Sequence, residues 1–163
     1  MNARQSLKES MNTPNMIVQA YLGDLSDEDL LQRPVEGANH IAWQLGHLIS
    51  SEHSLIEMVC PGTMPSLPDG FAEKYTKETS TLDDAGAFHT KAEYLKLMEE
   101  QRVGTLAALE NLSDDDLDKP VPESLAAIAT NVGGVFSMQP THWTMHAGQW
   151  AVLRRKLGRA PLF

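Results

Sequence analysis

Apolar residues recur at helical spacing along four long stretches of the chain, at residues 4–23, 40–60, 88–111 and 137–157. Within each stretch these residues stand three or four positions apart, which places them on one face of a helix. The pattern predicts an all-α fold: a four-helix bundle that forms a single domain over residues 1–163.

Proline, glycine and small polar residues mark where these helices begin and end. Either Thr13 is the N-cap of the first helix, with Pro14 in the first turn, or the proline bends a longer helix. Asn39 is the expected N-cap of the second helix. Pro140 is expected in the first turn of the fourth helix, which Gly158 ends.

The connection between the second and third helices, residues 61–87, is unusually long and contains three prolines and three glycines. Long connections inside a compact domain usually serve a purpose. Here the geometric purpose would be to cross one end of the bundle, so that the third helix runs parallel to the second.

A short acidic segment occurs twice. Residues 25–30 read Leu-Ser-Asp-Glu-Asp-Leu, and residues 112–117, at an offset of 87, read Leu-Ser-Asp-Asp-Asp-Leu. Each has a serine three positions before an aspartate, which resembles a capping box and predicts a short helical turn. Unless the match is due to chance, the repeat makes the first helix equivalent to the third and the second to the fourth.

Three histidines carry the strongest chemical signal. His142 and His146 stand four residues apart, so they share one face of the fourth helix, and His47 lies on the second helix. Two buried imidazoles side by side without a ligand would leave ring nitrogens unpaired, which is costly. A metal ion removes that cost, so the spacing predicts a metal site of His47, His142 and His146. The alternative is that each is an ordinary hydrogen-bonded core residue.

The other histidines and the tryptophans are harder to place. His40 stands two turns before His47 on the same face, and one alternative is that it lines the pocket or supports the ligands. We expect it to be exposed instead, because it follows the expected N-cap. His53 and His89 are expected outside the site. Three tryptophans lie on the helices that carry the site: Trp43, Trp143 and Trp150. They fill the core or a dimer face, or they form the wall of an apolar pocket around the metal.

Charge and composition exclude several classes of function. The formal net charge is −9 at pH 7 and no basic face is visible, which argues against binding to nucleic acid or anionic membranes. No apolar run approaches the roughly 20 residues of a membrane span, and the N-terminal residues lack the apolar core of a signal peptide. Cys60, the single cysteine, is expected to be a passive buried thiol. These features predict a cytoplasmic protein.

Several catalytic motifs are missing. No glutamate follows His142, as the zincin protease motif would require, and no Glu-x-x-His pair typical of di-iron bundles occurs on the helices. The sequence also lacks glycine-rich phosphate-binding motifs and the Gly-x-Ser-x-Gly motif.

Two stretches resemble the DinB-like superfamily of damage-inducible DinB and YfiT-type proteins. One is residues 39–49, Asn-His-Ile-Ala-Trp-Gln-Leu-Gly-His-Leu-Ile, with Glu52 after it. The other is His-x3-His-Ala-Gly-Gln at residues 142–149, followed by Leu-Arg-Arg at 153–155 and Gly158. The loop Leu-Pro-Asp-Gly-Phe at residues 67–71 also looks like the crossover of that family. The resemblance covers nearly the whole chain.

This resemblance implies a bundle of up-down-down-up topology and a homodimer. It also implies one divalent metal ion, zinc or nickel, held by His47, His142 and His146 with water in the open positions. Some relatives are transferases or isomerases that use a low-molecular-weight thiol such as bacillithiol or mycothiol.

Two functional hypotheses follow. In the first, the protein is a metal-dependent enzyme that transfers a thiol to an electrophilic small molecule or hydrolyses a small-molecule substrate. In the second, it is a non-enzymatic, stress-associated bundle whose metal is structural or sequestered. A third reading, in which no metal binds, stays open at this point.

Overall fold

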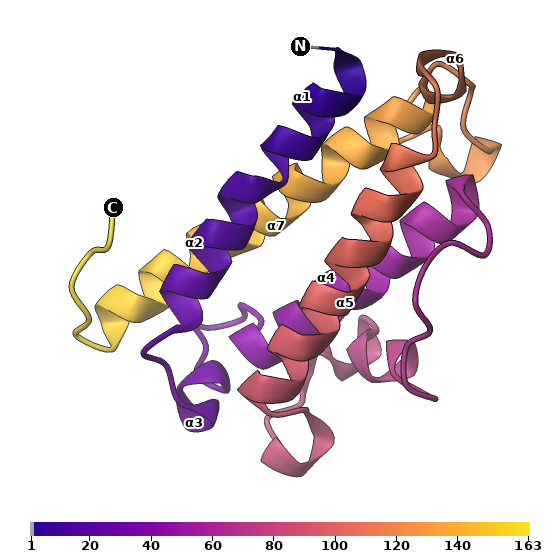
Figure 1. Ribbon diagram of the computed structural model, residues 1–163. Helices are drawn as coiled ribbons and strands as arrows, with labels where there is room; N and C mark the ends of the chain where they lie inside the picture. Colours follow the sequence, from indigo (N-terminus) through magenta and orange to yellow (C-terminus); the bar gives the residue numbers. More distant parts are fainter. Residues whose placement is uncertain (1) are drawn as a thin grey trace.

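The computed structural model describes residues 2–163, and all long elements in that range are helices, as the sequence predicts (Figure 1). Its only β-type feature there is an isolated bridge between Pro120 and Asn131. The elements are α1 (Ala3–Ser10), α2 (Asn12–Leu22), α3 (Asp27–Leu30), α4 (Ile41–Val59), η1 (Ala72–Tyr75), η2 (Glu78–Thr81), η3 (Ala85–Ala87), α5 (Lys91–Glu110), α6 (Asp114–Leu117), η4 (Glu123–Leu125) and α7 (Val132–Lys156), where η denotes a 3-10 helix.

The long helices pack in neighbouring pairs. Helices α1 and α2 lie along α7, and α4 lies between α5 and α7 (Figure 1). Their apolar faces form two clusters of buried side chains, one that includes Trp143 and Trp150 and one that includes Ile56 and Phe136. Helices α4 and α7 are in direct contact, which brings the two histidine-bearing elements together.

The first helical stretch is broken at Met11, which separates α1 from α2. Pro14 is the third residue of α2, and its missing N–H group leaves the carbonyl of Ser10 without its usual helical partner. Met11 keeps near-helical dihedral angles, φ −78° and ψ −16°. Pro14 therefore lies in the first turn of α2, as the first alternative expected, but the N-cap is Met11 and not Thr13. Because α1 ends only one residue before α2 begins, neither alternative holds in full.

Helix α7 begins earlier than the sequence pattern indicates. It starts at Val132 rather than near residue 137, with Asn131 as N-cap, whose side-chain oxygen accepts a hydrogen bond of 2.8 Å from the Gly134 N–H. Pro140 consequently lies inside the helix and not in its first turn. Two glycines in the first turn weaken the apolar periodicity there, so the pattern hid the true start. Gly158 follows the helix with φ +74°, the left-handed cap conformation expected of it.

Helix α4 is capped by His40 and not by Asn39. The Nδ1 atom of His40 accepts a hydrogen bond from the backbone N–H of Trp43 (3.1 Å), and its Nε2 atom lies 3.0 Å from the carbonyl oxygen of Leu82. His40 is fully buried, so the expectation that it is exposed was wrong. The chain around Leu82 covers this histidine and thereby ties the long connection to the start of α4.

The repeated acidic segments have the same local structure. Ser26 with Asp29, and Ser113 with Asp116, each form a complete capping box at the start of a one-turn helix, α3 and α6 respectively. The final leucine of each segment is buried. The local prediction from the repeat is therefore confirmed.

Candidate metal centre

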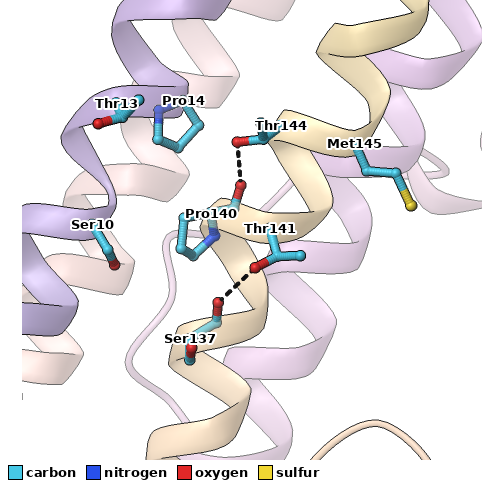
Figure 2. A pocket seen from close by; sticks show the side chains of 8 residues that line it. All are labelled: Ser10, Thr13, Pro14, Ser137, Pro140, Thr141, Thr144 and Met145. Atoms are coloured by element: carbon cyan, nitrogen blue, oxygen red, sulfur yellow. Dashed lines mark hydrogen bonds between the residues drawn. The ribbon is translucent and has the colours of Figure 1, made fainter.

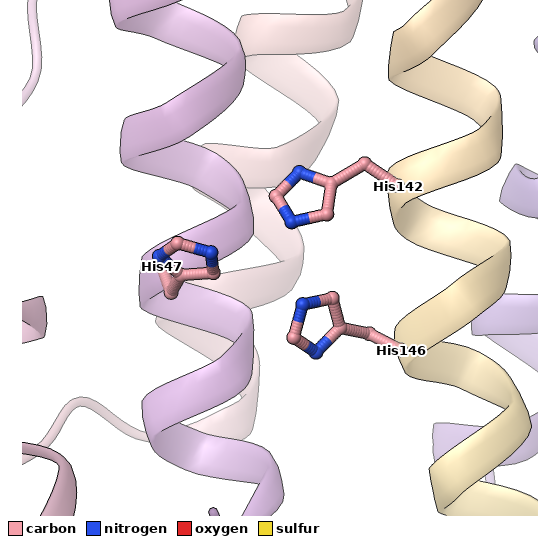
Figure 3. A group of neighbouring side chains, drawn as sticks. All are labelled: His47, His142 and His146. Carbon is pink, nitrogen blue, oxygen red and sulfur yellow. The ribbon is translucent and has the colours of Figure 1, made fainter. Parts of the chain in front are cut away.

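His47, His142 and His146 converge in the space between α4 and α7 (Figure 3). The ring centroids are 5.2 Å apart for His47 and His142, 5.6 Å for His47 and His146, and 5.0 Å for the pair on α7. One potential ligand nitrogen of each ring lies within 4.8 Å of those of the other two rings. The structure thus brings together the three residues that the sequence singled out.

The surroundings keep these imidazoles neutral. Burial lowers the pKa of His142 and His146 to about 4, with a smaller contribution from the neighbouring histidines, and burial also lowers the pKa of His47. A neutral imidazole has one lone pair available for a metal, whereas the protonated ring has none. At neutral pH all three side chains are therefore competent ligands.

The donor set fits a divalent transition-metal ion, because imidazole is a ligand that several such ions bind. Nitrogens that ligate one ion at about 2.0–2.1 Å lie no more than roughly 4.2 Å apart, and the candidate nitrogens, all within 4.8 Å of one another, are close to that limit. Between residues 2 and 163, the ring nitrogens of His47 and His142 have no hydrogen-bond partner, and no carboxylate or thiol joins the group. Three protein ligands leave coordination positions for water or substrate.

Gln44 is a site residue that the sequence analysis missed. It is fully buried on α4, one turn before His47, and its Oε1 atom lies 3.0 Å from Nδ1 of His146 and accepts a 2.8 Å hydrogen bond from the indole of Trp150. Its amide nitrogen donates to the Oε1 atom of Gln149 on α7, 3.1 Å away. Both α7 partners of Oε1 stand about a hundred positions further along the chain, so no local pattern pointed to Gln44.

The three tryptophans have different roles. The Trp43 ring stacks on the imidazole of His47, with centroids 5.0 Å apart and an interplanar angle of 8°, and its indole N–H donates to Thr76 and Thr79 of the long connection. It therefore forms one wall beside the histidines. Trp143 and Trp150 are buried in the same core cluster as Trp43, and their indole N–H groups donate to Glu52 and Gln44.

Trp143 belongs to a buried polar cluster next to the histidines. The carboxylate of Glu52 on α4 accepts hydrogen bonds of 2.7 Å from the Trp143 indole and 2.7 Å from the Thr105 hydroxyl, and it pairs with the Arg102 guanidinium at 3.1 Å. All four side chains are buried. The cluster fastens α4, α5 and α7 to one another within two turns of His47.

The remaining reactive residues lie outside the centre. His53 bonds to Gln101 at 3.0 Å, and His89 contacts the hydroxyl of Tyr75. Cys60 is buried, and burial raises the pKa of its thiol, which agrees with a passive role.

A separate open cavity of about 500 Å³ lies between α1–α2 and α7 (Figure 2). Its hydroxyl groups are largely engaged with their own helices; for example, Thr144 donates to the carbonyl of Pro140 at 2.7 Å. None of the three histidines lines it. The convergence of metal-ligating nitrogens, and not cavity size, therefore places the candidate site.

No helix between residues 2 and 163 combines the length and the apolar character needed to cross a lipid bilayer. A search of curated proteins found no match. The model of the DinB superfamily matches residues 14–150, a range that includes all three histidines and most of the helical scaffold. The chain belongs to the DinB superfamily.

Proposed function

We propose that the protein binds one divalent metal ion, zinc or nickel, through His47, His142 and His146 and uses it to act on a small molecule. The observation that carries this proposal is the convergence of three neutral imidazoles without a fourth protein ligand. The reaction is transfer of a low-molecular-weight thiol to an electrophile, or hydrolysis.

The residues of the site and those around it have different roles in the proposed reaction. Bound between the three rings, a divalent ion supplies Lewis acidity, which activates a thiol or a water molecule at neutral pH. The buried indole of Trp43 stacks on the imidazole of His47 and so limits the orientations that this ligand can take. The buried Glu52 cluster holds α4 against α7.

Metal analysis is the first test. The wild-type protein, purified and then exposed to zinc or nickel, is expected to retain one equivalent of metal, and the variant in which all three histidines are alanine is expected to retain none. His53→Ala is the matched control, because it removes a partly buried histidine on the same helix that lies outside the group. Retention of metal by the triple variant would overturn the proposal.

Activity is the second test. Metal-loaded protein incubated with thiols and model electrophiles is expected to be faster than His146→Ala, with His53→Ala unchanged. Equal rates for wild type and His146→Ala would remove the enzymatic part of the proposal.

A non-enzymatic role is the second candidate. It is favoured by the composition of the group, which contains histidines alone and no carboxylate that could serve as a general base. Cobalt-substituted protein separates the two candidates: a spectral change on addition of a thiol favours the enzyme, whereas an unchanged spectrum favours a closed structural or storage site.

The family assignment also supports two architectural proposals. The first is the up-down-down-up bundle, consistent with the long connection between α4 and α5. The second is a homodimer, for which Met16 on α2 and Met145 and Val152 on α7 offer exposed apolar side chains. Sedimentation of wild type and Met145→Lys tests the dimer, which is expected to weaken in the variant.

A further inference from the structure

The amide group of Gln44 uses its full hydrogen-bonding capacity. Its Oε1 atom faces the Nδ1 atom of His146 at 3.0 Å and the Nε1 atom of Trp150 at 2.8 Å. Its Nε2 atom donates to the carbonyl oxygen of Asn39 at 2.6 Å and to Oε1 of Gln149 at 3.1 Å. A buried residue on α4 thus joins two successive turns of α7.

Two partners fix which way round this amide lies. The indole N–H of Trp150 can only donate a hydrogen bond, so the atom that faces it must be the amide oxygen. The carbonyl of Asn39 can only accept, so the atom that faces it must be the amide nitrogen. The orientation of Gln44 therefore follows from both ends without any assumption about His146.

The orientation of Gln44 in turn decides the tautomer of His146. The amide oxygen carries no hydrogen, so the bond between it and Nδ1 of His146 requires a proton on Nδ1. A neutral imidazole carries only one ring proton. The Nε2 atom of His146 is then unprotonated and has its lone pair free.

We propose that Gln44 is a positioning residue of the metal centre, which holds His146 in the Nδ1–H form so that Nε2 is its ligand atom. The inference rests on the metal site proposed above and adds the donor atom and the residue that selects it. Metal-ligating histidines usually donate their other ring N–H to an oxygen acceptor, and loss of that acceptor typically weakens metal binding 10- to 100-fold.

The tautomer can be measured without any metal. In long-range ¹H–¹⁵N spectra of metal-free, histidine-labelled protein, His146 is expected to show a protonated Nδ1 and an unprotonated Nε2. In Gln44→Leu this single-tautomer signature is expected to disappear. A proton on Nε2 in the wild type, or an unchanged spectrum in Gln44→Leu, would overturn the proposal.

Zinc affinity gives a second readout, through competition with a chromophoric chelator. Gln44→Leu is expected to bind zinc 10- to 100-fold more weakly. Gln44→Glu keeps an oxygen acceptor toward His146 and Trp150 but places a second oxygen against the carbonyl of Asn39. It is therefore expected to lose stability while it retains the tautomer and most of the affinity. If Gln44→Leu and Gln44→Glu lose zinc affinity in proportion to their loss of stability, Gln44 has a merely structural role and the proposal is contradicted.

Gln101→Leu is the matched control. Gln101 is also a buried glutamine bonded to a histidine ring, with Oε1 3.0 Å from Nδ1 of His53 and Nε2 2.8 Å from the carbonyl of Pro65. This variant is expected to lose stability without any change at His146. If the wild type binds neither zinc nor nickel, the proposed function fails, while the metal-free spectra still decide separately whether Gln44 selects the tautomer.

Discussion

The ring of Tyr75 lies directly against the backbone of Gly46, so that a Cβ atom on this glycine would stand 2.2 Å from the nearest ring carbons. Gly46 is the residue before His47 on α4, and Tyr75 is the last residue of η1. The Tyr75 hydroxyl is also bonded to that of Tyr94 on α5, 2.8 Å away. Absence of a side chain at position 46 therefore lets η1 pack onto the helix that carries His47.

Gly46→Ala is expected to destabilise the protein by about 1–3 kcal/mol, because the added methyl group forces the tyrosine ring or the helix to move. Urea unfolding measures the change. Gly148→Ala serves as the control: its Cβ would meet nothing within 4 Å, and alanine in a helix stabilises by roughly 0.5–1 kcal/mol relative to glycine. The change in the free energy of unfolding should therefore have opposite signs in the two variants, and equal signs would contradict the prediction.

His40 should make stability sensitive to mild acid. Burial lowers the pKa of His40, and the nearby charge of Arg33 lowers it further. The Leu82 carbonyl and Asp83 act in the opposite direction but are outweighed. Since the folded pKa lies below the unfolded value of about 6.5, the unfolded chain takes up the proton first, and stability is lost as the pH falls below 6.5. Protonation would also convert the capping Nδ1 atom from an acceptor into a donor.

The measurement is the free energy of unfolding from pH 7.5 to 5. For this one histidine the slope can reach about 1.4 kcal/mol per pH unit. His40→Asn keeps a side chain that can cap α4 but does not titrate, so its curve is expected to be flatter than that of the wild type. Parallel curves would show that His40 contributes nothing to the acid sensitivity.

Glu52→Ala is expected to cost about 3–5 kcal/mol, since it leaves the buried guanidinium of Arg102 without its carboxylate and two further donors without an acceptor. Glu100→Ala on α5 removes one partner of the exposed pair with Lys96, and should change stability by less than about 1 kcal/mol. Chemical denaturation of both variants tests whether burial makes the difference. Similar small losses would argue against a structural role for the Glu52 cluster.

Asn131→Ala is expected to destabilise the protein by about 1 kcal/mol through loss of the cap of α7. Asn39→Ala, at the position where the sequence pattern suggested a cap and the structure has none, is expected to stay within about 0.5 kcal/mol of the wild type. Thermal unfolding compares the two. A larger effect at position 39 than at 131 would contradict the observed helix starts.

The metal-ligand candidates could be predicted because their signal is local. The spacing of His142 and His146 fixes their common face through helix geometry alone. His47 needed only the assumption that its helix faces theirs, and the contact of α4 with α7 bears this out. The capping boxes at Ser26 and Ser113 were equally readable, because each is complete within four residues.

The features that escaped prediction depend on residues far apart in the sequence. His40 is buried by the chain around Leu82, and Gln44 is held by His146 and Trp150 of α7. The start of α7 was misplaced for a different reason. Proline is common in the first turn of helices, but Pro140 lies inside α7. There, tertiary packing outweighs the local cost of the missing N–H group.

The histidine group takes one member from the first half of the chain and two from the second. Neither half alone holds the three ligands, so an ion that binds all three connects the two halves of the chain. Its binding free energy is then added to the free energy of unfolding, because the unfolded chain lacks the assembled site. Metal content would thus report how much of the protein is correctly assembled, independently of any reaction at the site.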